Sequence, residues 1–282
     1  MIDIIKVSII GTGQIGTDLL HKLLKMQNIQ IVVFVGRRQC NKKIPSNILY
    51  SDKGLQYFIL NPNCCDVVFD CTDATSSIIN SIIFIQQKIK IINLTPSIIG
   101  DMFIPNITPV INDNLNMVTC GGQVAIPLLC FLYKNSIQPI YAEVITQISS
   151  QSAGLATRIN IDNYIEKTEK AIYSCIDILK CKVILNINPN PNIVMKTTIY
   201  LKTKYCNFNE IYTFVEKIRK YINNYEITEP IWISENILMV HIKIISSGDY
   251  ISYYHGNLDV INCVAIESLK YINNNINTLI TI

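Results

Sequence analysis

A single cysteine, Cys120, stands where the neighbouring residue types suit nucleophilic chemistry. In NMVTCGGQVAIP, residues 116–127, it ends a short apolar run and precedes Gly121, Gly122 and a helix-compatible segment that begins near Gln123. A cysteine reacts as its thiolate, which the start of a helix stabilises. The amides of the two glycines are free in this reading to hydrogen-bond an oxyanion. The pattern predicts Cys120 as a catalytic nucleophile.

A glycine-rich turn, GTGQIG at 11–16, follows an apolar run near the start of the chain. Gly11 permits a tight turn, Gly13 lets the backbone approach a pyrophosphate, and Gly16 lets helix and strand pack closely. The phosphate would lie at the helix N-terminus, where amides are unpaired. The motif predicts dinucleotide binding; the alternative is a glycine-rich turn in an α/β fold without a ligand.

The position that discriminates between nicotinamide cofactors is unusual. Rossmann folds commonly place an acidic residue about 20 positions after the glycine loop, where it holds the ribose hydroxyls. Here the second apolar run ends FVGRR, with Arg37 and Arg38. Guanidinium groups favour a 2′-phosphate. The arginine pair therefore predicts that NADP is accepted as a cofactor, and solvated surface arginines are the alternative.

Together, a dinucleotide site and a poised cysteine predict aldehyde oxidation. A thiolate adds to the aldehyde, hydride leaves to nicotinamide and an acyl-enzyme remains. The three histidines, His21, His241 and His255, are scattered along the chain. They form no obvious Cys–His pair and are expected to be structural.

Alternating patterns predict an α/β fold with a Rossmann-type parallel sheet in the first half. The expected strands are 6–11, 29–36, 66–72, 88–96 and the strand end 117–120, and the expected helices are 14–26 and 76–87. The second half favours an α+β domain. Its expected strands are 139–149, 182–187, 193–203 and 236–246, and its expected helices are 158–179, 208–222 and 257–275.

Composition excludes several classes of protein. The 282 residues suffice for two domains, and 49% hydrophobic against 16% charged residues argues against disorder. The net charge of +3, without a basic cluster, predicts no nucleic-acid partner. No apolar run reaches the ~18 residues of a membrane-spanning helix. The start, MIDIIKVSIIGTG, carries Asp3 and Lys6 and leads into the glycine loop, so it indicates a first strand and not a signal peptide.

Cysteine usage points to the cytoplasm. Ten cysteines without an export signal are expected to be reduced thiols. They show no CxxC pair and no Cys/His cluster with zinc spacing, so no metal is expected. Most of the others, such as Cys71 and Cys175, suit a buried structural role.

Five segments together resemble the acylating acetaldehyde dehydrogenases. They are KVSIIGTGQIGTDLL, INLTPSIIG, NMVTCGGQVAIP, YAEVITQISSQSAGLATRINIDNYIEKTEKAI and GNLDVINCVAI. The resemblance implies oxidation of acetaldehyde, or another short aldehyde, with NAD⁺ and coenzyme A to acyl-CoA and NADH. It also implies a homodimer and a 4-hydroxy-2-oxovalerate aldolase as partner, in the meta-cleavage catabolism of aromatic hydrocarbons.

Carried over by position, the resemblance places the acyl thioester on Cys120. It implies a dinucleotide-binding domain of residues 1–119 plus 254–282 and a catalytic and dimerisation domain of 120–253. The cofactor-binding residues that the motif and the resemblance together predict are Gly11, Thr12, Gly13, Gln14, Ile15, Gly16, Ser152, Ala153, Gly154, Leu155, Ala156, Thr157, Arg158, Ile159, Asn160 and Asn257.

The chain also departs from the family pattern. Leu155 and Ala156 replace the usual Pro and Gly, and Thr197 stands where an acidic residue is typical. Loss of that acid puts transfer of the acyl group in question more than hydride transfer. One alternative is a semialdehyde dehydrogenase that forms an acyl phosphate, which needs a phosphate subsite and a histidine base that the sequence does not place. Another is a decayed homologue that serves as a nucleotide-binding scaffold for the aldolase.

Overall fold

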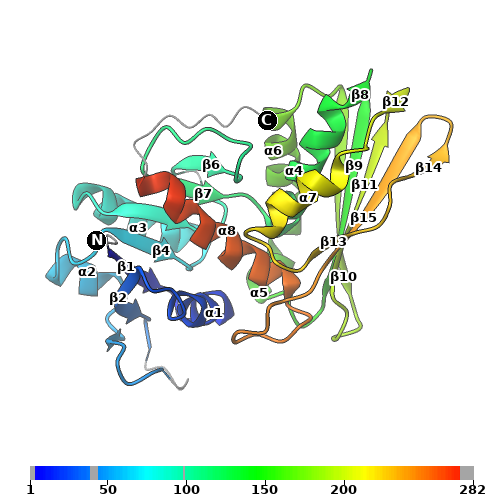
Figure 1. Ribbon diagram of the computed structural model, residues 1–282. Helices are drawn as coiled ribbons and strands as arrows, with labels where there is room; N and C mark the ends of the chain where they lie inside the picture. Colours follow the sequence, from blue (N-terminus) through cyan, green and yellow to red (C-terminus); the bar gives the residue numbers. More distant parts are fainter. Residues whose placement is uncertain (1–3, 39–43, 98, 274–282) are drawn as a thin grey trace. The chain divides into compact units, whose positions relative to one another are not determined.

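The computed structural model describes residues 4–38, 44–97 and 99–273, which form two compact units (Figure 1). Unit 1 takes the chain up to Phe103, Pro109–Met117 and the stretch that begins at Ala265. Unit 2 takes Ile104–Thr108 and Val118–Val264. The change of unit after Val264 falls inside the last helix, α8 (Gly256–Asn273). The domain boundaries predicted from the sequence differ from this division and stay a prediction.

Unit 1 contains a seven-stranded sheet whose pairings are all parallel, in the order β3-β2-β1-β4-β5-β7-β6. The chain order reverses on either side of β1, as in a doubly wound Rossmann sheet. The predicted parallel sheet is confirmed. Its strands are β1 (Ile5–Ile10), β2 (Ile29–Val35), β3 (Tyr50–Ser51), β4 (Val67–Asp70), β5 (Lys90–Asn93), β6 (Asp101–Phe103) and β7 (Leu115–Met117).

Helices α1 (Gln14–Leu23), α2 (Leu55–Leu60) and α3 (Ala74–Gln86) belong to unit 1, together with the part of α8 that begins at Ala265. All four residues of β4 are buried, as expected for a strand covered on both faces. Phe58 of α2 and Phe84 of α3 are fully buried and meet edge to face, with ring centroids 4.9 Å apart. The same apolar cluster includes Ile10, the last residue of β1, after which the glycine loop begins.

Unit 2 contains a six-stranded mixed sheet in the order β10-β9-β11-β15-β13, with β14 also paired to β15. A two-stranded sheet of β8 and β12 lies apart from it. The elements are α4 (Cys120–Lys134), β8 (Ser136–Ile137), β9 (Tyr141–Ser149), α5 (Leu155–Ile159), α6 (Ile161–Cys175), β10 (Lys180–Asn188), β11 (Met195–Lys202), β12 (Tyr205–Cys206), α7 (Ile211–Arg219), β13 (Tyr225–Ile227), β14 (Ile231–Ser234) and β15 (Ile237–Ile244).

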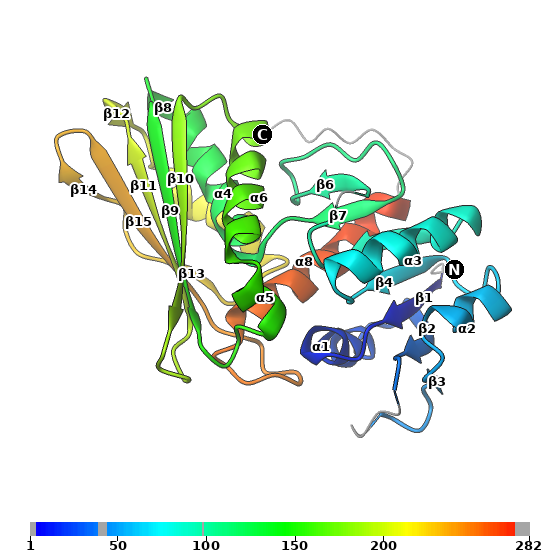
Figure 2. The ribbon, with the colours of Figure 1, turned by 180° about the vertical axis from the view of Figure 1, so that it is seen from behind.

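Helices α4, α6 and α7 lie on one side of this sheet in both views (Figures 1 and 2). Strand β11 shows the consequence, because Met195, Thr197, Ile199 and Leu201 are buried while the residues between them are more exposed. In neither view does a helix of the described chain cover the opposite face. The predicted α+β character of the second half is confirmed.

The start of α4 corrects one sequence expectation. Strand β7 ends at Met117 and the helix begins at Cys120, whereas the sequence predicts a strand to Cys120 and a helix from near Gln123. The cause is Thr119, whose side-chain oxygen accepts the Gly122 N–H at 3.1 Å and caps the helix early. Cys120 is therefore a first-turn residue.

The predicted helix 158–179 is shorter than expected, because α6 ends at Cys175 and Ile176 is extended. Of the predicted helix 257–275, residues 274 and 275 lie outside the described residues. Within the described chain no helix is long and apolar enough to cross a membrane. The same residues contain no group of three or more His, Cys, Asp or Glu able to hold a metal ion.

Candidate active site

Cys120 occupies the first turn of α4, directly after the capping residue Thr119. The cysteine is partly exposed, while Gly121 and Gly122 are buried. Helix N-termini carry a partial positive charge, which favours an anion such as a thiolate. The backbone therefore presents Cys120 in the setting that the sequence predicts.

A tyrosine from another helix completes the surroundings of the thiol. The Tyr164 hydroxyl of α6 lies 3.8 Å from the Cys120 sulfur and accepts the Gly121 N–H at 3.0 Å. Sequence reasoning misses this residue, since it lies 44 positions from Cys120 and no motif marks it. The one available signal is its place on the amphipathic helix that follows SSQSAG.

Two threonines hold α4 and α6 together beside the thiol. The Thr119 and Thr168 hydroxyls are 2.6 Å apart, and the Thr168 hydroxyl donates to the Tyr164 carbonyl at 2.7 Å. Since Thr168 has used its proton, Thr119 is the donor in the first of these bonds. The cap of α4 is thereby linked to the backbone of Tyr164.

Position 121 requires glycine because neighbouring side chains leave no room for a Cβ atom. A Cβ added there would lie 2.2 Å from the Tyr164 hydroxyl oxygen and 2.6 Å from the Thr146 side-chain oxygen. Thr146 in turn meets Thr197 at 3.2 Å between hydroxyl oxygens, and both are buried. Thr197 thus contacts the threonine that packs against Gly121, and forms a neutral polar pair at the position where the resemblance leads us to expect an acid.

In unit 1, the glycine loop fits a pyrophosphate. Gly11 has φ +108°, and a Cβ there would lie 2.7 Å from the Cys71 carbonyl group. A Cβ at Gly16 would lie 1.9 Å from the Gly11 carbonyl oxygen. A Cβ at Gly13, the N-cap of α1, would meet nothing within 4 Å, which leaves room for a ligand at the helix start. Thr12, Gln14 and Ile15 lie in the same turn and first helical residues.

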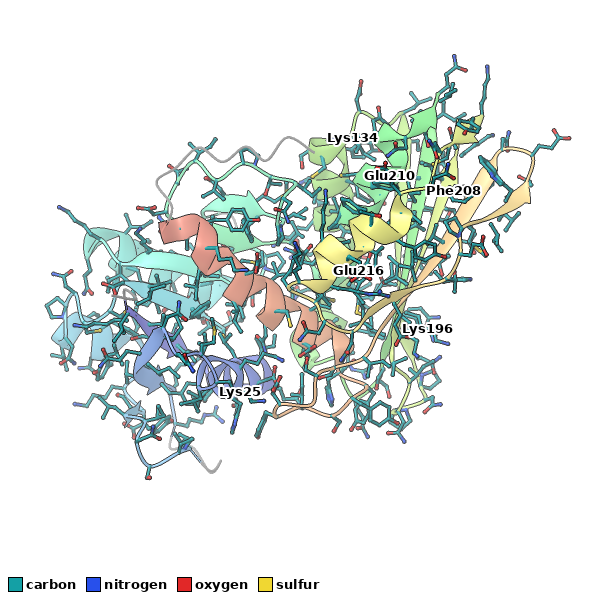
Figure 3. The ribbon with its side chains drawn as sticks, viewed as in Figure 1. Lys25, Lys134, Lys196, Phe208, Glu210 and Glu216 are labelled. Carbon is teal, nitrogen blue, oxygen red and sulfur yellow. The ribbon has the colours of Figure 1, made fainter. Side chains whose placement is uncertain are left out.

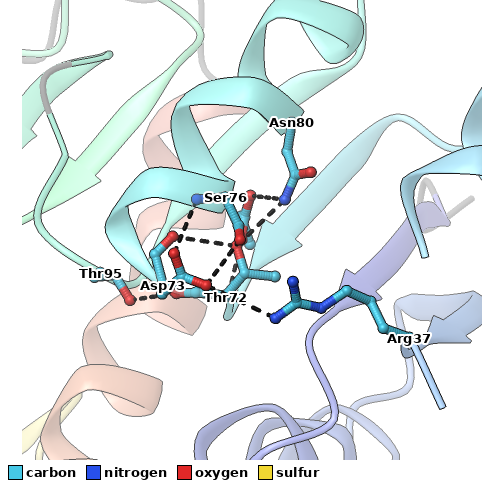
Figure 4. A network of polar contacts seen from close by, with 7 residues as sticks. Arg37, Thr72, Asp73, Ser76, Asn80 and Thr95 are labelled. Atoms are coloured by element: carbon cyan, nitrogen blue, oxygen red, sulfur yellow. Dashed lines mark hydrogen bonds and ion pairs between the residues drawn. The ribbon is translucent and has the colours of Figure 1, made fainter. Parts of the chain in front are cut away.

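The arginine pair after β2 has partners in the protein. Arg37 lies 3.8 Å from the Asp73 carboxylate, the side-chain cap of α3, as Figure 4 shows. The pair is exposed, and such pairs contribute only about 0–1 kcal/mol. Hydrogen bonds from Ser76 lower the pKa of Asp73, and Arg37 adds to that effect. The Arg38 carbonyl accepts the Tyr50 hydroxyl.

The second predicted cofactor segment lies in unit 2. Asn257 is buried and its side-chain amide donates to the Ser152 carbonyl at 3.3 Å. Arg158 donates to the carbonyls of Ala153 and Ser150, at 3.1 and 2.7 Å. Leu155, Ala156, Thr157 and Ile159 lie with Arg158 in α5, Gly154 precedes that helix, and Asn160 is the N-cap of α6. The cofactor roles of this segment stay a prediction.

Known proteins resemble this chain along almost its whole length. The family model "Prokaryotic acetaldehyde dehydrogenase, dimerisation" matches residues 120–252. An acetaldehyde dehydrogenase of Pectobacterium atrosepticum is 37% identical over 95% of this chain and 97% of its own. One from Spirochaeta aurantia is 36% identical over 93% and 92%. The chain belongs to the acetaldehyde dehydrogenase family. The predicted family is confirmed.

Solved structures of aspartate semialdehyde dehydrogenases share the fold of this family member. Aspartate semialdehyde dehydrogenase II of Vibrio cholerae superposes with a TM-score of 0.69 at 12% identity, over 96% of this chain and all of its own. The enzyme of Candida albicans, solved with NADP, gives 0.62 at 11% identity, over 96% and 99%. These likenesses confirm the predicted two-domain α/β class, and at such identity they show the fold alone.

A cavity of about 270 Å³ in unit 2 lies beside the C-terminal half of α4 and α7, away from Cys120. Lys134 and Glu210, both labelled in Figure 3, line it with the stacked rings of Phe131 and Phe214. Cys120 is not among its lining residues. No motif in the sequence predicts this cavity.

The amides of Gly121 and Gly122 are not free in the structure, unlike the expectation from the sequence. The Gly122 N–H is the capping bond to Thr119, and the Gly121 N–H donates to Tyr164. The prediction that both amides point freely at an oxyanion is therefore wrong. Burial raises the pKa of the Cys120 thiol, against hydrogen bonds from Tyr164 and from the amides of Gly121 and Cys120 that lower it. The helix start alone does not outweigh burial.

This balance predicts the pH dependence of Cys120 alkylation. Only the thiolate reacts with iodoacetamide. Because the pKa of Cys120 is raised, its alkylation rate should still be increasing at pH values above about 8.5, the ordinary pKa of a cysteine thiol. Cys64 is an internal control, because its hydrogen bond from Cys65 lowers its pKa to about 7. Peptide mass spectrometry across pH checks both. Cys120 titrating at or below Cys64 would contradict the expectation.

Proposed function

We propose that this chain oxidises acetaldehyde or another short aldehyde to the corresponding acyl-CoA through a thioester on Cys120. The observation that carries the proposal is a cysteine in the first turn of α4, with Tyr164 beside it, in a member of the acetaldehyde dehydrogenase family. The glycine loop, which fits a pyrophosphate, supports a nicotinamide dinucleotide as the oxidant.

The chain's own residues supply the steps around the carbonyl carbon. The Cys120 thiolate forms a C–S bond to the aldehyde carbon, and the carbonyl π pair moves to oxygen as an alkoxide. The alkoxide then collapses to the thioester. When bound, the nicotinamide ring accepts the hydride that leaves the carbon. The loop 11–16 would hold the pyrophosphate, and residues 152–160 with Asn257 would contact the rest of the cofactor.

Coenzyme A completes the proposed reaction as the acyl acceptor. Its thiolate forms a C–S bond to the acyl carbon, the bond from that carbon to the Cys120 sulfur breaks, and Cys120 leaves as a thiolate. Thr197 provides no carboxylate for this step, and its hydroxyl is paired with Thr146. Two alternatives stay open, namely transfer to phosphate, as in a semialdehyde dehydrogenase, and a non-catalytic scaffold.

The first test of this function is Cys120→Ser. A serine hydroxyl has a far higher pKa than a thiol, and no contact among the described residues brings a base to position 120. We therefore expect aldehyde-dependent NADH formation to be abolished while NAD affinity is unchanged. Mass spectrometry of the wild type after aldehyde and NAD⁺, without CoA, should find the acyl group on Cys120. Cys130→Ser, a buried cysteine lower on α4, is the control.

Assays with CoA, with orthophosphate and with neither acceptor separate the alternatives. Sustained NADH formation only with CoA supports the acyl-CoA product. Turnover that requires phosphate would favour the acyl phosphate, and no turnover with any short aldehyde would favour the scaffold.

We further propose NAD as the cofactor, with NADP accepted unusually well. Arg37 and Arg38 offer charge-assisted hydrogen bonds to a 2′-phosphate, and no acid at these two positions repels it. The weak, exposed pair with Asp73 leaves the Arg37 guanidinium largely accessible. Asp73 acts in the opposite direction, because its carboxylate would repel a phosphate that approaches Arg37.

Two sets of substitutions test this cofactor assignment. Arg37→Asp with Arg38→Ala should lower kcat/KM for NADP relative to NAD, about tenfold or more for each charge-assisted hydrogen bond that the substitutions remove. Asp73→Asn should raise the same ratio, because an asparagine still caps α3 while the negative charge is gone. Kinetics with both cofactors give the ratio. A ratio unchanged in both variants would mean that these residues do not meet the ribose.

Finally, we propose a homodimer formed through unit 2. The matched dimerisation model spans this unit, and the sheet face opposite α4, α6 and α7 carries the partly buried Ile145, Tyr200 and Met239 beside polar residues. The occupant of this face in our proposal is a second copy of the chain. The aldolase partner and the cytoplasmic location are inferred from the resemblance alone.

Light scattering tests this dimer. The wild type should have twice the mass of one chain, and Ile145→Arg should be monomeric because it places an unpaired charge in the interface. Tyr212→Arg, on the exposed side of α7, should stay dimeric. A monomeric wild type would exclude the dimer, and failure of a 4-hydroxy-2-oxovalerate aldolase from the native source to co-purify would remove that partner.

A further inference from the structure

We propose that Tyr164 is a catalytic residue of the aldehyde oxidation, and that its hydroxyl donates first to the Cys120 sulfur and then to the alkoxide. The inference rests on the proposed function and adds the group that handles the charge. It takes the place of the two free glycine amides expected from the sequence, which the structure finds engaged.

The direction of each hydrogen bond follows from counting protons. A backbone amide only donates, so the Gly121 N–H uses a lone pair of the Tyr164 hydroxyl oxygen. The tyrosine proton is left for another acceptor. The Cys120 sulfur lies 3.8 Å away, within reach of an O–H···S hydrogen bond. A thiolate has no proton of its own, so Tyr164 is the donor to it.

Of the nearby threonines, Thr119 also contacts the Tyr164 hydroxyl through its side chain and partly offsets the effect of burial on the pKa of that hydroxyl. Thr119 gives its proton to Thr168 and accepts from Gly122, as the cap of α4. Thr168 gives its proton to the Tyr164 carbonyl. These bonds anchor the first turns of α6 on the start of α4, two helices that lie side by side (Figures 1 and 2). Tyr164 is therefore held beside the thiol by its backbone carbonyl as well as by its hydroxyl.

The tyrosine stays a donor over the working pH range. Burial, with the neighbouring Cys120 as the next cause, raises its pKa well above the ordinary value of about 10. At neutral pH the hydroxyl is protonated. The bond that it accepts from Gly121 polarises its O–H and strengthens its own donation, since hydrogen bonds in a chain are cooperative.

In the proposed reaction the negative charge moves from the sulfur to the carbonyl oxygen, and both atoms are bonded to the aldehyde carbon. As the C–S bond forms, sulfur loses its charge and the carbonyl oxygen gains it. The new alkoxide is bonded to the carbon that sulfur has attacked, so a donor already at the sulfur needs only a small shift to reach it. When the alkoxide re-forms C=O and hydride leaves, no proton has to move. Tyr164 ends the step protonated, as it began.

The test is Tyr164→Phe, which keeps the ring and removes only the hydroxyl. Loss of one oxyanion donor lowers kcat by about 10²- to 10³-fold. We expect that fall in kcat with little change in KM for the aldehyde. Tyr173→Phe is the matched control, because this residue lies on the same helix and its hydroxyl also accepts one backbone amide, that of Cys181, at 2.9 Å. It should retain wild-type kcat.

A second readout does not depend on aldehyde turnover. In Tyr164→Phe, the pH at which iodoacetamide labels Cys120 half-maximally should move upward, because a donor to the thiolate is gone. Thermal unfolding of both variants shows that the fold is kept. Wild-type kcat with an unchanged labelling profile would overturn the proposal. If the wild type forms no acyl-Cys120 but the labelling shift is present, the proposed function fails while the contact between Tyr164 and the thiol stands.

Discussion

The start of α4 depends on one hydrogen bond, from the Gly122 amide to the side chain of Thr119. An N-cap of this kind contributes about 1 kcal/mol, a modest amount. Its larger effect is positional, because it makes Cys120 a first-turn residue and aims the capping hydroxyl at Thr168. Through that second threonine, the backbone of Tyr164 is fixed beside the thiol. The cap of α4 thereby helps to position Tyr164 of α6 beside Cys120.

The second constraint is the close approach of other atoms to the backbone, which leaves no room for a Cβ atom and is met by glycine in both units. At Gly121 a Cβ would displace Tyr164, and at Gly16 a Cβ would lie 1.9 Å from the Gly11 carbonyl oxygen. Neither position has a positive φ in this structure, so the requirement there is space and not backbone conformation. Gly11, at φ +108°, needs both. Gly13 differs from all three, since the space beside it is open toward the helix N-terminus.

The sequence predicted those features that depend on residues close to one another in the chain. The turn at 11–16, the parallel sheet and the cysteine at a helix start follow from residues that lie next to one another in the chain. The contacts of Tyr164 with Cys120 and of Arg37 with Asp73 join residues 44 and 36 positions apart, and no periodicity encodes them. The early start of α4 was missed for a related reason: two glycines after Cys120 lower helix propensity, and the Thr119 cap outweighs them.

The groups that hydrogen-bond the Cys120 sulfur are all uncharged, and this limits how far they lower its pKa. A neutral hydrogen bond contributes about 0.5–1.5 kcal/mol net, less than one from a charged partner such as a histidinium. Burial therefore prevails and the pKa of Cys120 stays raised, so the resting thiol is protonated and poorly reactive toward oxidants. A cation beside the sulfur would stabilise the thiolate more than the alkoxide that follows it. In the proposed reaction, a tyrosine hydroxyl within reach of both atoms would donate to the thiolate and then to the alkoxide.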